Sequence, residues 1–141
     1  MTHYLMKTEP DVYGWHDMLQ DGVTEWDGVN NPAALQALRA MVPGDQAFFY
    51  HTGDERRIMG VVEILRAALP DPKDAKGKMV LVRVKPIAQL HQPVTLAAIK
   101  QDDFFKDFAL VRQSRLSVMV VPPLFLARIL DMSGGLSQIK A

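Results

Sequence analysis

The sequence has 141 residues, which is the usual length of one domain. It is 48% hydrophobic and 23% charged, and its 16 Lys and Arg residues balance 16 Asp and Glu residues. This composition excludes a fully disordered chain and the strongly basic balance of a general DNA-coating protein, and the absence of cysteine excludes disulfides, thiolate metal ligands and a cysteine nucleophile.

The ends and the apolar runs of the chain bear on its location and domain limits. No apolar stretch approaches the roughly 18 residues of a membrane-spanning helix, and residues 1–30 lack the pattern of a secretory signal. We therefore expect a cytoplasmic protein with no membrane partner. The glycine- and serine-rich sequence after residue 132 predicts a flexible C-terminal tail over 133–141, which leaves a single domain over 1–132.

The N-terminal part of the chain predicts alternating strands and short helices. A strand is expected over 3–7, and residues 13–20 carry apolar side chains at helical spacing. Residues 23–26 are predicted to be extended. Asn31 followed by Pro32 marks the start of a helix that runs to about residue 41, because Asn accepts a free backbone amide and Pro suits the first helical position.

The centre of the chain is rich in β-forming residues. Gly60 lies inside one apolar run and predicts a bulge or a close approach to another part of the chain. A polar loop with several charges is expected over 70–78. Strands are predicted over residues 46–51, 58–65 and 79–84, and residues 87–90 either continue the last of these or pair beside it.

The C-terminal part returns to helices. Thr95 is expected to cap a short helix that ends near Lys100, and three phenylalanines at 104, 105 and 108 are expected to cover an apolar surface. A last strand over 116–121 precedes a helix that begins at Pro123. The strands are joined by short loops, which predicts an α+β fold with a mostly antiparallel, barrel-like sheet and helices at its periphery.

Three segments combine polar or aromatic side chains in patterns that suit binding. Each also has a purely structural explanation: a solvated strand end, a tryptophan in the core, and a salt-bridged strand entrance. The segments are residues 5–10 (LMKTEP), 25–32 (EWDGVNNP) and 110–119 (LVRQSRLSVM). The four histidines, at 3, 16, 51 and 91, are scattered, so we expect no metal ion and no cofactor.

The neutral net charge hides an uneven distribution along the chain. Residues 1–30 contain one basic and six acidic residues, and the remainder contains fifteen basic and ten acidic residues. A basic face is therefore possible on a neutral protein, unless the opposite charges interleave in space.

Several motifs together resemble the EVE domain family. They run in order from residue 3 to about residue 130, so the resemblance covers nearly the whole chain. The matching motifs are LMKTEP at 5–10, WDGV at 26–29, FYHT at 49–52, LPD at 69–71 and RQSRLSVM at 112–119. The resemblance implies a PUA-like fold, which is a small, mostly antiparallel β-barrel with flanking helices, related to the YTH domains that read methylated adenine.

The resemblance also implies a function. Members of the family are regarded as non-catalytic modules that bind nucleic acid carrying a modified base, with modified cytosine in DNA as the best-supported ligand. The base would be extruded from the helix and stacked on an aromatic face. We expect a monomer with nucleic acid as its partner.

The family's site residues are carried over by motif. Arginines at the rim would hold the flanking phosphates, and these are Arg56, Arg57, Arg112 and Arg115. The base pocket implied by the resemblance comprises Lys7, Thr8, Glu9, Trp26, Asn31, Tyr50, His51, Thr52, Leu116 and Ser117. In particular, Trp26, Tyr50 and the segment 115–117 are expected to border one cleft.

The chain departs from the family pattern at the start of the helix after Trp26. The family has Arg, Tyr and Arg where this chain has Asn30, Pro32 and Leu35, which removes positive charge from that surface.

Two other functions stay open. One is a small hydrolase of a modified nucleobase or nucleoside, similar to ASCH-type proteins, in which Lys7 and Glu9 would share one face of a strand while Thr8 points away. The other is a protein that binds a small molecule in the same cleft.

Overall fold

The computed structural model describes residues 1–139. Among these residues, no helix combines the length and apolar character needed to cross a membrane. The strands are β1 (His3–Thr8), β2 (Thr24–Trp26), β3 (Gln46–His51), β4 (Arg57–Pro70), β5 (Val80–Thr95), β6 (Val118–Val120) and β7 (Leu136–Gln138). The helices are α1 (Pro10–Tyr13), α2 (Trp15–Asp21), α3 (Pro32–Ala40), α4 (Leu96–Lys100), α5 (Ala109–Arg112) and α6 (Pro123–Met132), with one turn of 3₁₀ helix, η1 (Asp103–Phe105).

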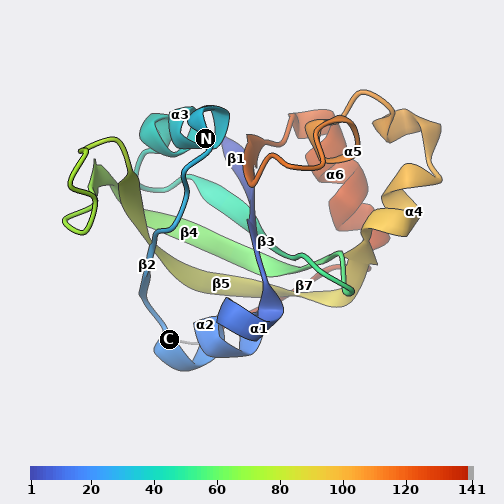
Figure 1. Ribbon diagram of the computed structural model, residues 1–141. Helices are drawn as coiled ribbons and strands as arrows, with labels where there is room; N and C mark the ends of the chain where they lie inside the picture. Colours follow the sequence, from blue (N-terminus) through green and yellow to red (C-terminus); the bar gives the residue numbers. More distant parts are fainter. Residues whose placement is uncertain (140–141) are drawn as a thin grey trace.

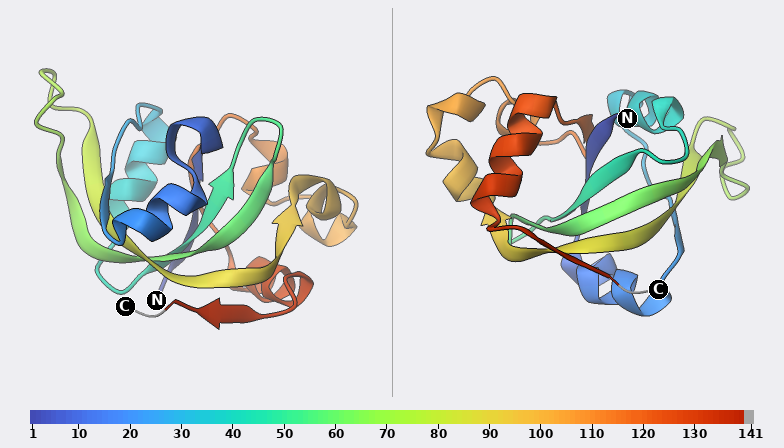
Figure 2. Two further views of the ribbon diagram at one scale, coloured as in Figure 1. Left: turned by 90° about the horizontal axis from the view of Figure 1, so that it is seen from below. Right: turned by 180° about the vertical axis from the view of Figure 1, so that it is seen from behind.

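All strands of the described part join one sheet that curls into an open barrel (Figures 1 and 2). The strand order is β2-β5-β4-β3-β1-β6, and β7 also pairs with β5. The β1–β3 pair is parallel and the other pairs are antiparallel. The pairing of the long strands β4 and β5 shifts register at several points, and such bulges bend a sheet. The predicted α+β fold with a mostly antiparallel, barrel-like sheet is confirmed.

The two faces of the sheet carry two separate hydrophobic cores, because successive side chains of a strand point to opposite faces. In β1, Tyr4 and Met6 belong to the core that α2 and α3 cover. Leu5, between them, belongs to the core that α4, η1, α5 and α6 cover. In Figure 1, α4 to α6 lie on the other side of β1 and β3 from α3.

Gly60 is the point where a helix presses on the sheet. It lies in β4 opposite Phe49, next to a register shift. The ring of Trp15, at the start of α2, occupies the space where a Cβ atom at position 60 would stand. The predicted close approach at Gly60 is therefore confirmed.

One predicted element differs from the structure for a local reason. The helix expected over 13–20 is two helices, because Gly14 is extended, at φ −97° and ψ 176°, and separates α1 from α2. Of the two arrangements expected for residues 87–90, the structure has the continuation: they belong to the same strand as residues 80–84, β5, which passes through Pro86 at an irregularity of its pairing with β4. A bulge tolerates proline because a ladder hydrogen bond is already missing there.

The end of the chain packs on the sheet instead of leaving it as a tail. Ser133 is fully buried, and Gly134 and Gly135 have φ of 75° and 119°, which turns the chain back towards β5. Leu136–Gln138 then pairs with β5 as β7. The flexible tail predicted over 133–141 is thus corrected as far as Gln138, and residues 140–141 lie outside the described part.

Candidate functional site

A cleft of about 500 Å³ opens where the two free edges of the curled sheet approach each other. One wall is the end of β1 together with α1, and the other is the edge strand β2 and the turn after it. Ser117, directly before the other edge strand β6, completes it. The lining residues are Lys7, Thr8, Val12, Tyr13, Thr24, Glu25, Trp26, Asp27, Gly28, Val29 and Ser117.

The gap between the two free edges of the sheet stays open because the edge strands are short. β2 has three residues and pairs only with β5 among the described strands. On the other side, the Lys7 N–H donates to the Ser117 carbonyl at 2.8 Å, which extends the pairing of β1 with β6 up to the cleft. The sheet therefore presents side chains of β1, β2 and residue 117 to one hollow.

Aromatic rings form one side of the cleft and continue into the core. Trp26 borders the cleft but is only 6% exposed, and its ring meets Phe49 edge-on with 5.5 Å between centroids. Trp15 and Tyr13 contact the same Phe49 ring at 5.2 and 6.5 Å. Such edge and tilted contacts fix the ring orientations. Trp26 is thus both a core residue and part of the cleft wall, so the two interpretations from the sequence are compatible.

Tyr13 is a cleft residue that the sequence interpretation assigned only to a helix face. Its hydroxyl donates to the Asp21 carboxylate at 2.8 Å, and burial raises its pKa to about 12. The phenol therefore stays neutral at physiological pH. The sequence signal that could have identified Tyr13 as a cleft residue is its position three residues after Pro10, the residue that begins α1.

Lys7 lies between the cleft and a second hollow. Its Nζ donates to the Ser114 carbonyl at 3.0 Å and lies 5.7 Å from the centre of the Tyr50 ring. Burial lowers the pKa of Lys7. Two of its three N–H groups remain available for a ligand after the Ser114 bond.

The acidic side of the cleft is partly neutralised. Glu25 accepts two hydrogen bonds from Arg66, at 2.8 and 2.7 Å, and one from Arg83 at 2.9 Å. These bonds, that from Arg66 above all, hold the pKa of Glu25 below its ordinary value. The network ties β2 to β4 and β5, and it leaves Lys7 and Asp27 as the other charged residues of the cleft lining.

Part of the predicted base pocket lies in that second hollow, which we name the side pocket. Its volume is about 270 Å³. Tyr50 and Thr52 line it, and Tyr50 does so because alternation along β3 turns it to the opposite sheet face from Phe49. The complete lining is Lys7, Tyr50, Thr52, Gly53, Arg56, Leu96, Lys100, Leu110, Val111 and Ser114.

Two further predicted pocket residues have structural roles instead. His51 is buried, and its Nε2 accepts the Trp15 backbone N–H at 2.9 Å, so its Nδ1 carries the proton that is donated to Glu55 at 2.8 Å. Glu9 is exposed and precedes α1, where its carbonyl accepts the Tyr13 N–H. Neither residue lines the cleft.

A third hollow, of about 330 Å³, holds most of the remaining predicted residues. Arg112, Arg115 and Leu116 line it together with Asn31. The Asn31 side chain accepts the Ala34 N–H at 3.1 Å, which confirms the predicted helix cap. Of the residues expected to border one cleft, Trp26 and Ser117 do so, whereas Tyr50 and Arg115 line the two neighbouring hollows.

The four arginines predicted to hold phosphates also lie in different places. Arg56 lines the side pocket. Arg57 instead forms an ion pair with Glu55, at 3.0 Å, and lines none of these three hollows.

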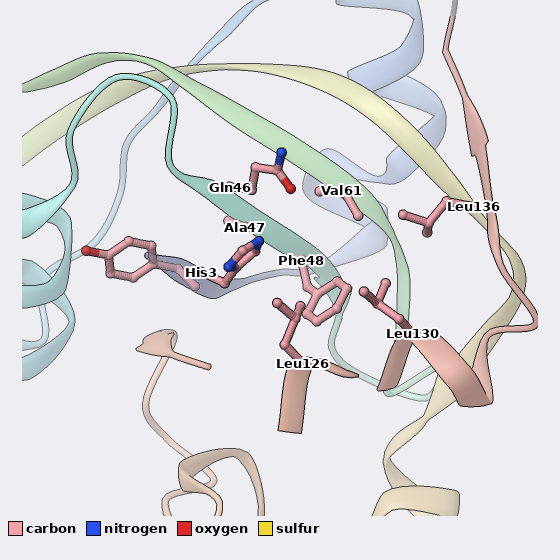
Figure 3. Close-up of a pocket in the computed structure, with 9 residues that line it drawn as sticks. His3, Gln46, Ala47, Phe48, Val61, Leu126, Leu130 and Leu136 are labelled. Carbon is pink, nitrogen blue, oxygen red and sulfur yellow. The ribbon is translucent and has the colours of Figure 1, made fainter. Parts of the chain in front are cut away.

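A small apolar cavity under α6 is too small to be the site. Its volume is about 40 Å³, and Figure 3 shows Leu126 and Leu130 facing Phe48 across it. Within residues 1–139, no group of three or more His, Asp or Glu side chains is placed to hold a metal ion.

Comparison with known proteins identifies the family of this chain over nearly its whole length. The model of the EVE domain family matches residues 2–132. Human thymocyte nuclear protein 1 is 38% identical over 87 residues, covering 50% of this chain and 36% of the human protein. The chain spans about a third of the length of such curated relatives.

Solved structures agree over nearly the full chain. A protein from Rhodopseudomonas palustris is 40% identical with a TM-score of 0.89, covering 95% of this chain and 94% of that one. Human thymocyte nuclear protein 1 in complex with DNA containing 5-methylcytosine is 27% identical with a TM-score of 0.82, covering 94% and 98%. A YTH domain from Zygosaccharomyces rouxii, at 17% identity and a TM-score of 0.58, covers 94% and 86% and shares the fold.

Proposed function

Because the chain belongs to the EVE domain family, we propose that it binds nucleic acid carrying a modified base, with modified cytosine in DNA as the ligand class. The base enters the cleft between β1 and β2. The observation that carries this proposal is the coincidence of that cleft with the family motifs: Lys7 and Thr8 come from the first, Trp26 from the second and Ser117 from the last. The chain of the human relative solved with 5-methylcytosine DNA has the same fold over 98% of the residues in that structure.

The cleft suits a single base in size and chemistry. Its volume of about 500 Å³ lies within the usual range of ligand pockets. A base inside a duplex must be extruded to reach it, which costs a few kcal/mol, and contact with an aromatic wall returns roughly 1–3 kcal/mol. Tyr13 and Trp26 supply that wall.

Polar groups around the wall are placed to read the base edges. Lys7 has two free N–H donors, and Ser117 offers a hydroxyl that both donates and accepts. The Thr8 hydroxyl donates to the Tyr13 carbonyl at 2.9 Å, so it faces a ligand as an acceptor. Donors and acceptors of both kinds therefore surround the position of the base.

Phosphate contacts come from the third hollow. Arg112 and Arg115 stand beside Asn31 at the start of α3, the region in which two arginines of the family pattern are replaced by Asn30 and Leu35. Leu35 is only 5% exposed and packs in the core. We propose that Arg112 and Arg115 hold phosphates of the bound strand in place of the missing arginines.

The hydrolase alternative expects Lys7 and Glu9 to point together into one pocket. Lys7 and Thr8 line the cleft, whereas Glu9 does not, so Lys7 lacks the carboxylate partner that this alternative assigned to it. Binding without catalysis is the function that this geometry supports better.

A binding screen tests the proposal. The protein is titrated with fluorescent oligonucleotides that carry modified cytosine or modified adenine, as DNA and as RNA, beside the unmodified sequences. We expect preference for a modified base and affinity that falls as salt rises, because phosphate contacts release counterions. Equal affinity for every oligonucleotide would reject base recognition, and affinity for a free modified nucleoside alone would favour a small-molecule receptor.

A further inference from the structure

Three cationic side chains from separate elements converge on the side pocket. Lys7 comes from β1, Arg56 from the turn before β4, and Lys100 from the end of α4. The hydroxyl-bearing residues Tyr50, Thr52 and Ser114 line the same hollow. A hollow of about 270 Å³ with this lining offers hydrogen-bond donors from several directions.

The positive charge of the side pocket is not cancelled within it. Among residues 1–139, Lys7, Arg56 and Lys100 form no ion pair, unlike the arginines at 57, 66, 83 and 128. No carboxylate of the described residues belongs to the lining. Asp54 and Glu55, next to Arg56 in the chain, line an adjacent hollow that Arg56 and Lys100 also border, and Glu55 is bound to His51 and Arg57.

The backbone at Arg56 is held in an unusual conformation. Its φ is +43°, the left-handed region that glycine or asparagine adopts more easily. The Leu96 N–H donates to the Arg56 carbonyl at 2.8 Å and fixes this turn against the start of α4. Strained residues of this kind gather at ligand sites, and here the strain accompanies an arginine that borders the side pocket.

We infer that the side pocket binds a phosphate group, held by Lys7, Arg56 and Lys100. A phosphate presents several oxygens that accept charge-assisted hydrogen bonds from separate donors, which matches three cations and three hydroxyl-bearing residues around one hollow. The phosphate has two possible sources: the strand whose base occupies the cleft, or a free phosphate-bearing small molecule.

Lys7 connects this inference to the proposed function. It lines both the cleft and the side pocket, so a nucleotide that fills both would bring its base and a phosphate to either side of one ammonium group. Burial lowers the pKa of Lys7, and a phosphate anion nearby would compensate for that burial. The strand as source rests on the proposed function, whereas free phosphate does not.

The first experiment titrates the ¹⁵N-labelled protein with inorganic phosphate and with deoxycytidine 5′-monophosphate. We expect shifts at the amides of Thr52, Arg56 and Lys100. Arg56→Gly and Lys100→Ala should each weaken binding about tenfold, the loss of one charge-assisted hydrogen bond. Lys73→Ala is the matched control, because Lys73 is an exposed lysine in the β4–β5 loop, far from α4 in Figure 1.

Arg56→Gly also separates binding from folding. Glycine accepts a φ of +43° without strain, so the variant should keep or raise its melting temperature while it loses phosphate affinity. If Lys73→Ala weakened binding as much as the two pocket variants, the effect would be one of net charge and the inference would be wrong.

The second experiment uses a modified-cytosine oligonucleotide in which methylphosphonates replace the phosphates next to the modified base. If the strand supplies the phosphate, the substitution weakens binding to the wild type but not to Lys100→Ala. If it has no effect while free phosphate binds, the ligand is a separate small molecule. No effect in either experiment would overturn the inference and leave base binding intact, whereas phosphate binding without oligonucleotide binding would overturn only the proposed function.

Discussion

Gly60→Ala tests how closely α2 packs on the sheet, because the ring of Trp15 packs against this residue. The added Cβ would lie 2.2 Å from Cζ2 and 2.3 Å from Cη2 of Trp15. Carbon atoms in ordinary contact are about 3.5–4.0 Å apart, so the indole ring must move by roughly 1.5 Å. It has little room, because it is 4% exposed, contacts Phe49, and donates from Nε1 to Gln89 at 3.2 Å.

The expected loss of stability follows from these contacts. Overpacking of a buried site costs about 1–3 kcal/mol, and breaking the Nε1 hydrogen bond adds about 1 kcal/mol. The lower backbone entropy of alanine in the unfolded chain offsets about 0.4–1 kcal/mol. We therefore expect a decrease of about 2 kcal/mol in the free energy of unfolding, which lowers the melting temperature by about 4–8 °C in a chain of this size.

Urea unfolding followed by tryptophan fluorescence measures this change, and Trp15→Phe provides the rescue. The smaller ring lacks the indole atoms that meet the new Cβ, so Gly60→Ala should cost about 1 kcal/mol less in the Trp15→Phe background. A Gly60→Ala protein as stable as the wild type, or a full loss in both backgrounds, would refute the steric argument.

Four other changes have defined outcomes. Trp26→Phe keeps an aromatic ring against the core but reduces the aromatic surface of the cleft wall. The binding free energy for a modified-cytosine oligonucleotide, measured by fluorescence anisotropy, should therefore weaken by about 1 kcal/mol. Unchanged affinity would show that Trp26 does not contact the base. Because hydrogen bonds from Arg66 lower the pKa of Glu25 in the folded protein, the stability that this carboxylate contributes is fully present above its ordinary pKa of 4.5 and is lost as pH falls through the lower folded pKa. Glu25→Gln should therefore flatten that part of a profile of unfolding free energy against pH. An unchanged profile would contradict a stabilising role of the Glu25–Arg66 pair. Asn31→Ala removes the cap of α3 and should cost about 1 kcal/mol in urea unfolding, with a loss below about 0.3 kcal/mol counting against the cap. Wild type and Lys7→Ala should both leave modified nucleosides unchanged in a chromatographic assay, and turnover by the wild type that disappears in Lys7→Ala would establish the hydrolase instead.

Local signals in the sequence predicted much of the fold. The Asn31 cap and the apolar strands around Phe49 depend on neighbouring residues, and the structure has them where the sequence places them. Local signals left open whether residues 87–90 continue the strand before them, because the passage of β5 through Pro86 depends on a bulge formed with β4. The strand after Gly135 likewise depends on a distant partner, since the same glycines suit a flexible tail and a turn back to the sheet.

The candidate site shows the same division between local and long-range information. Sequence motifs identify residues that belong to one region, but the alternation of side chains along β3 sends Phe49 and Tyr50 to opposite faces. That geometry turns one expected pocket into a cleft and two neighbouring hollows. His51 illustrates the limit, because its bonds to the Trp15 amide and to Glu55 use both ring nitrogens in the fold.

The affinity of the wild-type protein for two DNA duplexes that differ by a single 5-methylcytosine, measured at the same salt concentration, tests whether the cleft binds a modified base. We expect tighter binding of the methylated duplex, with the difference reduced in Trp26→Phe, because the modified base occupies the cleft beside that ring. Equal affinity for the two duplexes, or a preference that Trp26→Phe leaves unchanged, would rule out base recognition in this cleft.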